Sequence, residues 1–188
     1  MKTFKYLIRR AKSINCNFLV PYFELLQFSP NLINDFIVYD GERTVLSMTS
    51  DIELIEGLLQ NGANLTMPAF SSKRKYKSKY NQYSYLTIDA KPTNAHYFCY
   101  TNRLDIIKYL IKNNLLDVNL KDPNKNTLLH YAVINRVCAL DGVSRLELAM
   151  YLISNGANIN SLNDRFLTPM SGIPVEFQEE AYIKLTNI

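Results

Sequence analysis

Histidine and cysteine are the residue types in this chain that could carry nucleophilic or metal chemistry, and both are scarce. The 188 residues include two histidines and three cysteines. Cys99 follows His96 by three positions, so both side chains share one face of a helix and form a conceivable base–nucleophile pair. The sequence contains no phosphate-binding glycine loop, dinucleotide turn, paired-cysteine metal motif or nucleophile elbow. Cys16 and Cys138 have no closely spaced partner, which favours free thiols in a reducing compartment.

Both histidines follow a threonine by three positions. The motif is Thr93-Asn-Ala-His96, and it recurs as Thr127-Leu-Leu-His130. A threonine at a helix N-cap can accept a hydrogen bond from the first turn, and the third residue after it can reach back to the cap. A structural role near a helix start therefore explains both histidines, and Cys99 is expected to be a buried core residue. We predict no catalytic residue, no metal ligand and no cofactor, and thus a non-enzymatic protein.

The elements that must position these residues recur with a fixed period. Thr93 and Thr127 are 34 residues apart, and so are His96 and His130. Each start is followed by a second segment whose apolar residues have helical spacing. These residues are Ile106, Ile107, Leu110 and Ile111 in one copy, and Leu148, Tyr151 and Leu152 in the next. A period of this length is typical of an all-α solenoid, in which stacked helix pairs bury one another's apolar faces.

Further helix boundaries indicate less regular copies. Helix starts are expected at Thr168-Pro169, where proline suits the first helical position, and more weakly at Thr44-Val-Leu-Ser47. Second helices are expected to end at Asn61-Gly62 and Asn155-Gly156, because glycine adopts the left-handed cap conformation at little cost.

These motifs resemble the ankyrin repeat, whose pattern is roughly D-x-x-G-x-T-P-L-H-x-A, then L-E-I-V-K-L-L, then N-G-A-D-V-N. The middle is matched by Thr127-Leu-Leu-His-Tyr-Ala132 and Leu104-Asp-Ile-Ile-Lys-Tyr-Leu110. The end is matched at residues 61–65, 117–119 and 155–160. The resemblance covers about residues 40–173. It implies helix–loop–helix units joined by β-hairpin-like finger loops, and protein–protein interaction as the function.

The copies depart from the family pattern in several places. Asn114 stands where the family has glycine, and Leu115-Leu116 adds a residue. Extra residues separate Gly62 from Thr93 and also lie around 137–144, whereas the unit at 44–62 is short. The repeats are therefore irregular and diverged.

We expect one ankyrin-repeat domain over residues 1–188. Its segments are an N-terminal helical cap (1–39), a repeat (40–66), an inserted basic, tyrosine-rich loop (67–91), a repeat (92–120), a repeat with an inserted loop (121–160), and a C-terminal half repeat with a capping helix (161–188). Within the cap, helices are expected at 4–11, 21–26 and 31–38. The tail is expected to form a closing helix from Pro174 to Leu185, with proline at its start.

The inserted loop is the most strongly charged stretch. From Lys73 to Lys79 five of seven residues are basic, and no acidic residue occurs between Glu56 and Asp89. The candidate binding residues here are Lys73, Arg74, Lys75, Tyr76, Lys77, Lys79, Tyr80 and Tyr83. Basic and aromatic side chains suit an acidic protein surface, or a nucleic-acid backbone or anionic lipid. A solvated loop is the other interpretation, and a net charge of +4 is too small to favour a nucleic-acid-binding protein.

The rest of the predicted partner surface lies on the concave face and the finger tips. The candidates are Tyr97, Tyr100, Tyr131 and Asn135 after the histidines, and Asn124 and Lys125 on a finger, beside Asp122 and Pro123. Packing of Tyr97 or Tyr131 against a neighbouring repeat is the alternative. We expect a protein partner with an acidic surface as one option, no small-molecule cofactor and no membrane span, because no apolar run approaches 18 residues.

The biological setting is inferred from composition and resemblance. Lys, Asn, Ile and Tyr are abundant, as in proteins of AT-rich genomes. This small chain with diverged repeats is similar to ankyrin proteins of intracellular or pathogenic bacteria and of large DNA viruses. The resemblance implies a host-directed effector or virulence factor. We expect no secretory leader and an intracellular location, including the host cytoplasm for an effector. The alternatives are a toxin-neutralising immunity protein, nucleic-acid binding through residues 73–85, and the targeting part of an enzyme.

Overall fold

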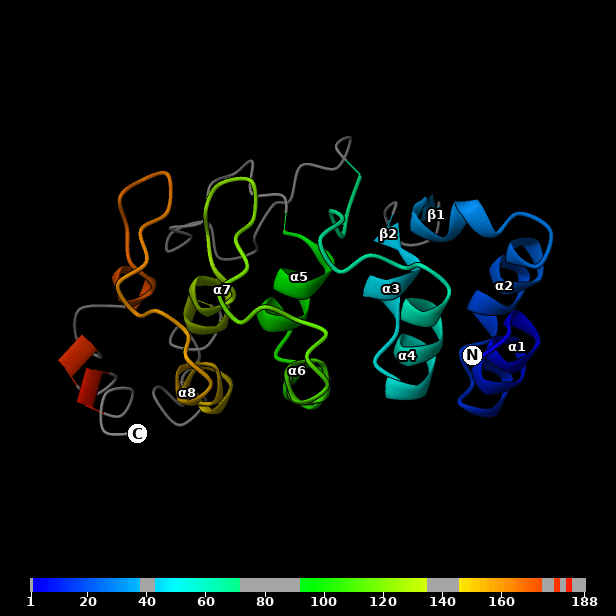
Figure 1. The fold of residues 1–188 in the computed structure, drawn as a ribbon, viewed down its shortest axis with the longest axis horizontal. Coiled ribbons are helices and arrows are strands. Elements are labelled where there is room, and N and C mark those ends of the chain that lie inside the picture. Colours follow the sequence, from blue (N-terminus) through cyan, green and yellow to red (C-terminus); the bar gives the residue numbers. More distant parts are fainter. Residues whose placement is uncertain are drawn as a thin grey trace. The chain divides into compact units, whose positions relative to one another are not determined.

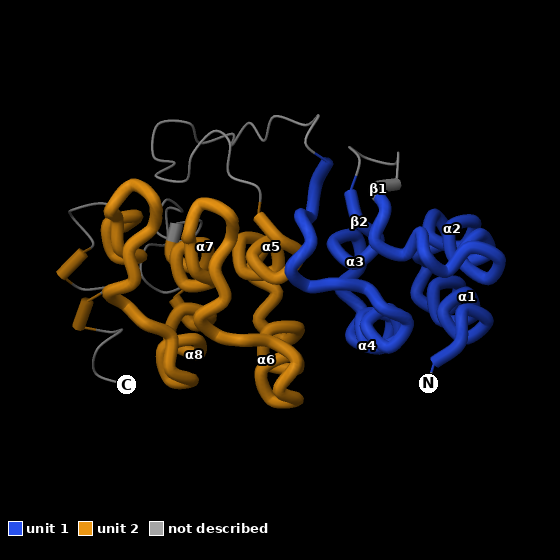
Figure 2. The backbone as a smooth tube through the Cα atoms, turned by 45° about the horizontal axis from the view of Figure 1, so that its top comes forward, with its two compact units in different colours: residues 1–74 blue, residues 75–188 orange. Residues whose placement is uncertain are grey.

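The computed structural model describes residues 2–37, 43–71, 92–134, 146–173, 178–179 and 182–183. The chain divides into two compact units, residues 1–74 and 75–188 (Figure 2). The elements of the first unit are α1 (Phe4–Ser13), η1 (Asn17–Leu19), α2 (Val20–Leu26), η2 (Pro30–Asn34), β1 (Phe36–Ile37), β2 (Arg43–Thr44), α3 (Val45–Met48) and α4 (Ile52–Gln60). Those of the second are α5 (Asn94–Tyr100), α6 (Leu104–Lys112), α7 (Leu128–Ile134), α8 (Glu147–Ser154) and η4 (Pro169–Gly172).

The first unit begins with two helices that pack on each other, α1 and α2 (Figure 1). The hydroxyl of Thr3 caps α1 by accepting the N–H of Tyr6. One face of α1 is buried at Leu7 and Ala11, and α2 buries Phe23 among its inward residues. Both helices confirm the amphipathic patterns at 4–11 and 21–26.

The prediction of a third helix in the cap, at residues 31–38, is wrong. Residues Pro30–Asn34 form the 3-10 turn η2, after which Asp35 is extended, with φ −74° and ψ 157°. Phe36–Ile37 then form β1, which pairs antiparallel with β2. A short apolar run fits a helix or a strand equally, and here pairing with residues further along the chain decides for the strand.

α4 is positioned by charged contacts from α1 as well as by apolar packing. Asp51 caps α4 by accepting the N–H of Leu54 at 2.9 Å. Its carboxylate also receives the Arg10 guanidinium, with N–O distances of 2.5 and 3.0 Å, which holds the pKa of Asp51 below its ordinary value. Gly57 allows the two helices to approach, because a β-carbon there would lie 2.4 Å from Cδ2 of Leu7.

The second unit stacks two helix pairs and the start of a third. α5 packs beside α7, α7 beside η4, and α6 beside α8, while each first helix also packs on its own second helix (Figure 1). Of the apolar positions expected from the helical spacing, Ile106, Ile107, Leu110, Leu148 and Leu152 are buried, whereas Ile111 and Tyr151 are half-buried. This is the all-α architecture of stacked helix pairs that the period predicts.

The second helices α4, α6 and α8 end in the same left-handed cap. The residues at this position are Gly62, Asn114 and Gly156, with φ of 97°, 54° and 92°. The N–H of the next residue returns to a carbonyl oxygen five residues earlier, at 3.0, 2.9 and 3.0 Å in the three helices. Asparagine is the non-glycine residue that most readily adopts this conformation, so Asn114 preserves the cap despite the missing glycine.

Asparagine side chains join the linker before a helix pair to the linker after it. In the first unit Asn34 donates to the carbonyl of Gly62 at 3.0 Å and accepts the N–H of Asn64 at 2.8 Å. In the second unit Asn119 makes the same two bonds to the linker after α8, at 2.9 Å each. The N-terminal cap therefore connects to the first repeat as one repeat connects to the next, a feature not predicted from the sequence.

The tail is described at residues 178–179 and 182–183, which are helical. Gln178 donates to the carbonyl of Ile173 at 2.8 Å. The rest of the closing helix predicted from Pro174 lies outside the described residues, as do the loop at 72–91 and the insertion at 135–145.

Candidate functional site

Two finger loops lead into helix starts of the second unit: finger A, residues 121–127, and finger B, residues 161–168 (Figure 1). Finger A closes at its base, where Lys121 and Thr127 form an antiparallel bridge. Finger B closes where the N–H of Asn163 donates to the carbonyl of Leu167 at 3.1 Å. These two loops are the finger loops that the sequence predicts between repeats.

His96 and His130 each connect a helix start to the next finger. Nδ1 of His96 lies 2.7 Å from the hydroxyl of Thr93, and its Nε2 lies 3.0 Å from a main-chain carbonyl of finger A. His130 lies in the same way between its own threonine hydroxyl, at 2.9 Å, and a main-chain carbonyl of finger B, at 3.0 Å. A carbonyl only accepts, so Nε2 carries the proton in both rings. Nδ1 of His130 accepts the N–H of Thr127 at 3.0 Å, and the lowered pKa of both histidines keeps the rings neutral. The histidines have the structural role near a helix start that the motif predicts, but the Thr93 hydroxyl makes no hydrogen bond with an N–H of the first turn and pairs with the His96 ring instead.

The environment of His96 and Cys99 is unlike that of an activated nucleophile pair. Burial lowers the pKa of His96 to about 4 and also lowers the pKa of His130. Burial raises the pKa of the Cys99 thiol, which is fully enclosed. A reactive cysteine needs the opposite shift, toward thiolate. Within the described ranges, no group of three or more His, Cys, Asp or Glu residues is arranged to hold a metal ion.

Asp122 is the buried anchor of finger A, which corrects its expected place on the exposed tip. One carboxylate oxygen accepts the N–H groups of Asn124 and Asn126, both at 2.8 Å. The other accepts the side-chain amide of Asn126 at 3.0 Å and the hydroxyl of Tyr131 at 2.6 Å. These bonds hold the turn of the finger against α7.

Tyr131 is a packing residue, and its predicted place on the partner surface is corrected on this ground. Its side chain is 1% exposed, and its ring centroid lies 5.1 Å from that of His96. Tyr97 is also buried and stacks on Tyr100, with centroids 6.5 Å apart, so the half-buried Tyr100 is the more accessible of the two.

Finger B repeats the design of finger A with Asn163 in the place of the aspartate. Oδ1 of Asn163 accepts the N–H groups of Arg165 at 2.9 Å and Leu167 at 3.1 Å. Its amide group donates to Oδ1 of Asn126 at 2.9 Å, a buried bond that joins the bases of the two fingers. The fingers therefore form one connected edge.

The tips of the fingers carry non-glycine residues in the left-handed conformation. Lys125 and Phe166 have φ of 59° and 58°, at the position where the D-x-x-G-x-T pattern has glycine. Nζ of Lys125 lies 2.8 Å from a carboxylate oxygen of Asp164, whose N–H donates to the carbonyl of Asn124 at 3.0 Å. Phe166 is 82% exposed and Leu162 is 47% exposed. The finger edge thus presents basic and apolar side chains on a bonded framework.

The predicted contact residues have different outcomes. Those outside the described residues are Lys73, Arg74, Lys75, Tyr76, Lys77, Lys79, Tyr80, Tyr83 and Asn135. On finger A, Asn124 is half-buried and Lys125 is exposed. Phe166 was not among the predicted contact residues, although Asn163-Asp-Arg-Phe166-Leu-Thr168 has the spacing of Asp122-Pro-Asn-Lys125-Asn-Thr127. That spacing was the signal that could have placed Phe166 on a finger tip.

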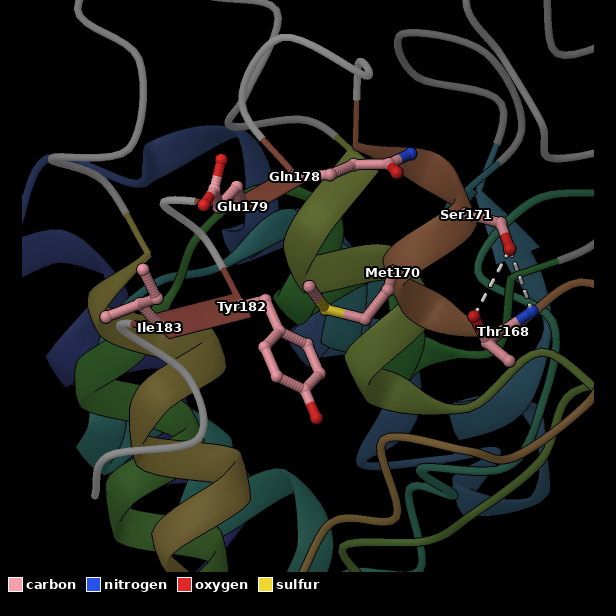
Figure 3. A pocket seen from close by; sticks show the side chains of 7 residues that line it. All are labelled: Thr168, Met170, Ser171, Gln178, Glu179, Tyr182 and Ile183. Carbon is pink, nitrogen blue, oxygen red and sulfur yellow. Dashed lines mark hydrogen bonds between the residues drawn. The ribbon is translucent and has the colours of Figure 1, made fainter.

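An open pocket of about 600 Å³ adjoins finger B at Thr168 (Figure 3). Its lining residues are Thr168, Met170, Ser171, Gln178, Glu179, Tyr182 and Ile183. Ser171 takes the place of the histidine in this copy, with its hydroxyl 3.2 Å from that of Thr168. The side chains of Met170 and Tyr182 lie next to each other in the pocket and add apolar surface beside finger B (Figure 3).

Comparison with models of known protein families finds ankyrin repeats, in three copies, over residues 45–163. The chain is an ankyrin-repeat protein. A search of curated proteins finds no match. Ankyrin repeats generally mediate protein–protein interaction and are typically non-enzymatic. None of the helices in the described ranges is long and apolar enough to cross a membrane.

Proposed function

We propose that this ankyrin-repeat protein binds a partner protein through the edge formed by fingers A and B, with Phe166 as the anchor. The observation that carries the proposal is the 82% exposure of an aromatic side chain at a left-handed tip position. That backbone conformation costs a non-glycine residue about 1–2 kcal/mol, so glycine would serve the fold better. An exposed aromatic side chain is, in contrast, the type of residue that contributes most at interfaces.

The framework beneath the tip supports binding without rearrangement. The bond between Asn163 and Asn126 and the ion pair between Lys125 and Asp164 connect the two fingers. Because these bonds already fix the conformation of the loops, little further conformational entropy is lost when the partner binds. A rigid edge of this kind favours a partner with a matching concave surface.

The chemistry of the edge indicates the kind of partner. Leu162 and Phe166 supply apolar area on finger B, where Arg165 is also exposed, and Lys121 is exposed on finger A. Lys125 is already partly neutralised by its aspartate. The partner that fits has an apolar pocket for Phe166 bordered by acidic groups, because opposite charges at the rim speed and orient association. Tyr100 and the loop at 67–91 stay as predicted further contacts.

A site-specific photo-crosslinker at position 166 tests this proposal. Position 28 is the matched control, because Phe28 is 87% exposed and belongs to the other unit. We expect one protein band to crosslink at position 166 and the same partner to be lost by Phe166→Ala but kept by Phe28→Ala. A partner that is kept by Phe166→Ala and lost when residues 70–86 become a Gly/Ser linker would contradict the finger edge.

The source of the crosslinked protein then separates the biological roles. Crosslinking in host-cell lysate to a host protein would support a host-directed effector, and crosslinking to a toxin from the source cell would support an immunity protein. A ribonuclease- or deoxyribonuclease-sensitive product in place of a protein would favour the nucleic-acid alternative.

A further inference from the structure

The N-terminal helix carries a basic surface that the fold does not use. Lys5, Arg9 and Lys12 are spaced at i, i+4 and i+7, so they share one face of α1, and all three are exposed. None of them forms an ion pair within the part of the chain that the structure describes. The acidic groups of α4 and its cap are engaged by a different set: Lys2 pairs with Glu56, Tyr6 with Glu53, and Arg10 with Asp51.

An exposed apolar stripe runs along α2, which ends at Leu26, and into the turn after it, with the exposed Glu24 beside it. Phe28 is 87% exposed and Leu25 is 47% exposed, and Pro21 precedes Leu25 by one helical turn. The opposite side of α2 is buried at Phe23 and Leu26. Because the buried side already supplies the core, the exposed stripe is surplus to the packing of this unit.

The basic stripe of α1 lies on the side of that helix away from α4. On α1, Leu7 and Arg10 face α4, through Gly57 and Asp51 respectively. The stripe that contains Arg9 is on the other side of α1 by helical periodicity. Figures 1 and 2 show α1 and α2 together at one end of the unit, and Figure 1 shows the turn that follows α2.

We propose that this face docks on an anionic phospholipid surface, with Phe28 and Leu25 entering the interfacial layer and Lys5, Arg9 and Lys12 contacting the headgroups. Basic residues beside exposed aromatic and aliphatic side chains are the combination that holds peripheral helices at a membrane interface. A second copy of the chain is disfavoured as the occupant, because it would bring the unpaired cations of two such faces together. A partner helix needs a groove, and this face is the outer side of two helices.

The absence of tryptophan from the chain allows a direct test. Phe28→Trp introduces a single fluorophore at the proposed contact, and Phe166→Trp is the matched control on the second unit. We expect phosphatidylcholine vesicles with about 30% phosphatidylserine to shift the emission of Phe28→Trp to the blue and to leave that of Phe166→Trp unchanged. No shift for Phe28→Trp, or equal shifts for both variants, would overturn the proposal.

Vesicle co-sedimentation of the full chain tests the basic stripe. The triple variant K5Q/R9Q/K12Q is compared with K112Q/K121Q/R165Q, which removes the same charge from exposed positions of the second unit. We expect the first variant to lose binding by on the order of 100-fold and the second to lose far less. Phe28→Ala is expected to lose about tenfold, the effect of one aromatic side chain leaving the interface.

Three outcomes would assign the face or the lipid binding elsewhere. Equal losses in the two triple variants would mean non-specific charge attraction. Loss only when residues 70–86 are replaced would move lipid binding to the loop. An emission shift of Phe28→Trp with soluble polyglutamate equal to that with vesicles would indicate an acidic protein instead. Each of these results overturns the membrane proposal. None of them contradicts the finger-edge proposal, because Phe166 is not part of the proposed lipid-binding face.

Discussion

The ring nitrogens of His96 and His130 illustrate how single residues hold this repeat together. Each ring accepts a hydrogen bond at Nδ1 within its own helix start and donates from Nε2 to the following finger. These hydrogen bonds take the place of bonds to water for the buried ring nitrogens and carbonyl oxygens. Removing one partner would leave the other without a hydrogen bond and lower the stability of the fold. The same network includes Asp122 and Tyr131, which anchor finger A.

His130→Ala should destabilise the protein. The substitution leaves the carbonyl of Leu167 and the cap at Thr127 without their ring partner. Loss of these buried hydrogen bonds is expected to lower the free energy of unfolding by about 1–3 kcal/mol. Urea denaturation measures the change, and an unaltered midpoint would contradict the role assigned to the ring.

Stability should fall in mildly acidic solution. The pKa of folded His96 is about 4, below the ordinary value of 6.5, so the unfolded chain binds more protons between these values. The stabilisation is complete above pH about 6.5 and is lost as the pH falls toward 4, by up to about 1.4 kcal/mol per pH unit for each histidine. Thermal melts at constant ionic strength from pH 7.5 to 4.5 measure it. Asp51, whose pKa is lowered, responds below this window, and a flat profile from pH 7 to 5 would contradict the prediction.

Phe166→Gly should separate stability from binding. Glycine adopts φ near 58° without the steric cost that phenylalanine bears, so the variant should be more stable by about 1 kcal/mol. The same variant should lose the partner, because the exposed ring is gone. Melting temperature and partner capture are measured on one preparation. A less stable variant would contradict the predicted gain in stability. A variant that still captures the partner would contradict the role of the exposed ring in binding.

At the scale of elements, short local signals set the ends of the helices, while close contacts set their spacing. The left-handed caps at Gly62, Asn114 and Gly156 end α4, α6 and α8 in the same way. In contrast, the distance between α1 and α4 depends on Gly57, which leaves no room for a β-carbon beside Leu7.

Gly57→Ala should therefore destabilise the protein, although alanine is the better helix former. The added carbon would lie 2.4 Å from Cδ2 of Leu7, and overpacking of this kind costs about 1–3 kcal/mol. Gly156→Ala is the control, because its β-carbon meets nothing within 4 Å and only the positive φ is strained. A double-mutant cycle with Leu7→Ala measures the clash, and additive effects of the two substitutions would show that it is absent.

At the scale of the whole molecule, the chain consists of two compact units, each built by stacking neighbours. In repeat architectures each unit's stability depends mainly on its own helices and their nearest neighbours. The candidate partner edge and the proposed lipid-binding face belong to different units, so a substitution in one need not disturb the other.

Native-state hydrogen exchange should resolve the two units. We expect Gly57→Ala to speed amide exchange mainly within residues 2–71, and His130→Ala mainly within residues 92–173. The physical reason is that local destabilisation opens the cooperative unit that contains it. Uniform acceleration over the whole chain by either variant would show that the units open together.

Local patterns in the sequence were sufficient to determine the period, the Thr-x-x-His helix starts, the buried faces of α6 and α8 and the left-handed caps. Each of these depends on residues within about one helical turn, or on a repeat spacing that can be counted. Only the tertiary structure decided that Phe36–Ile37 pair as a strand, that Tyr131 is buried against His96, and that Phe166 is exposed. These outcomes depend on which distant segments lie alongside a residue, and a side chain's exposure follows from that arrangement rather than from its own type.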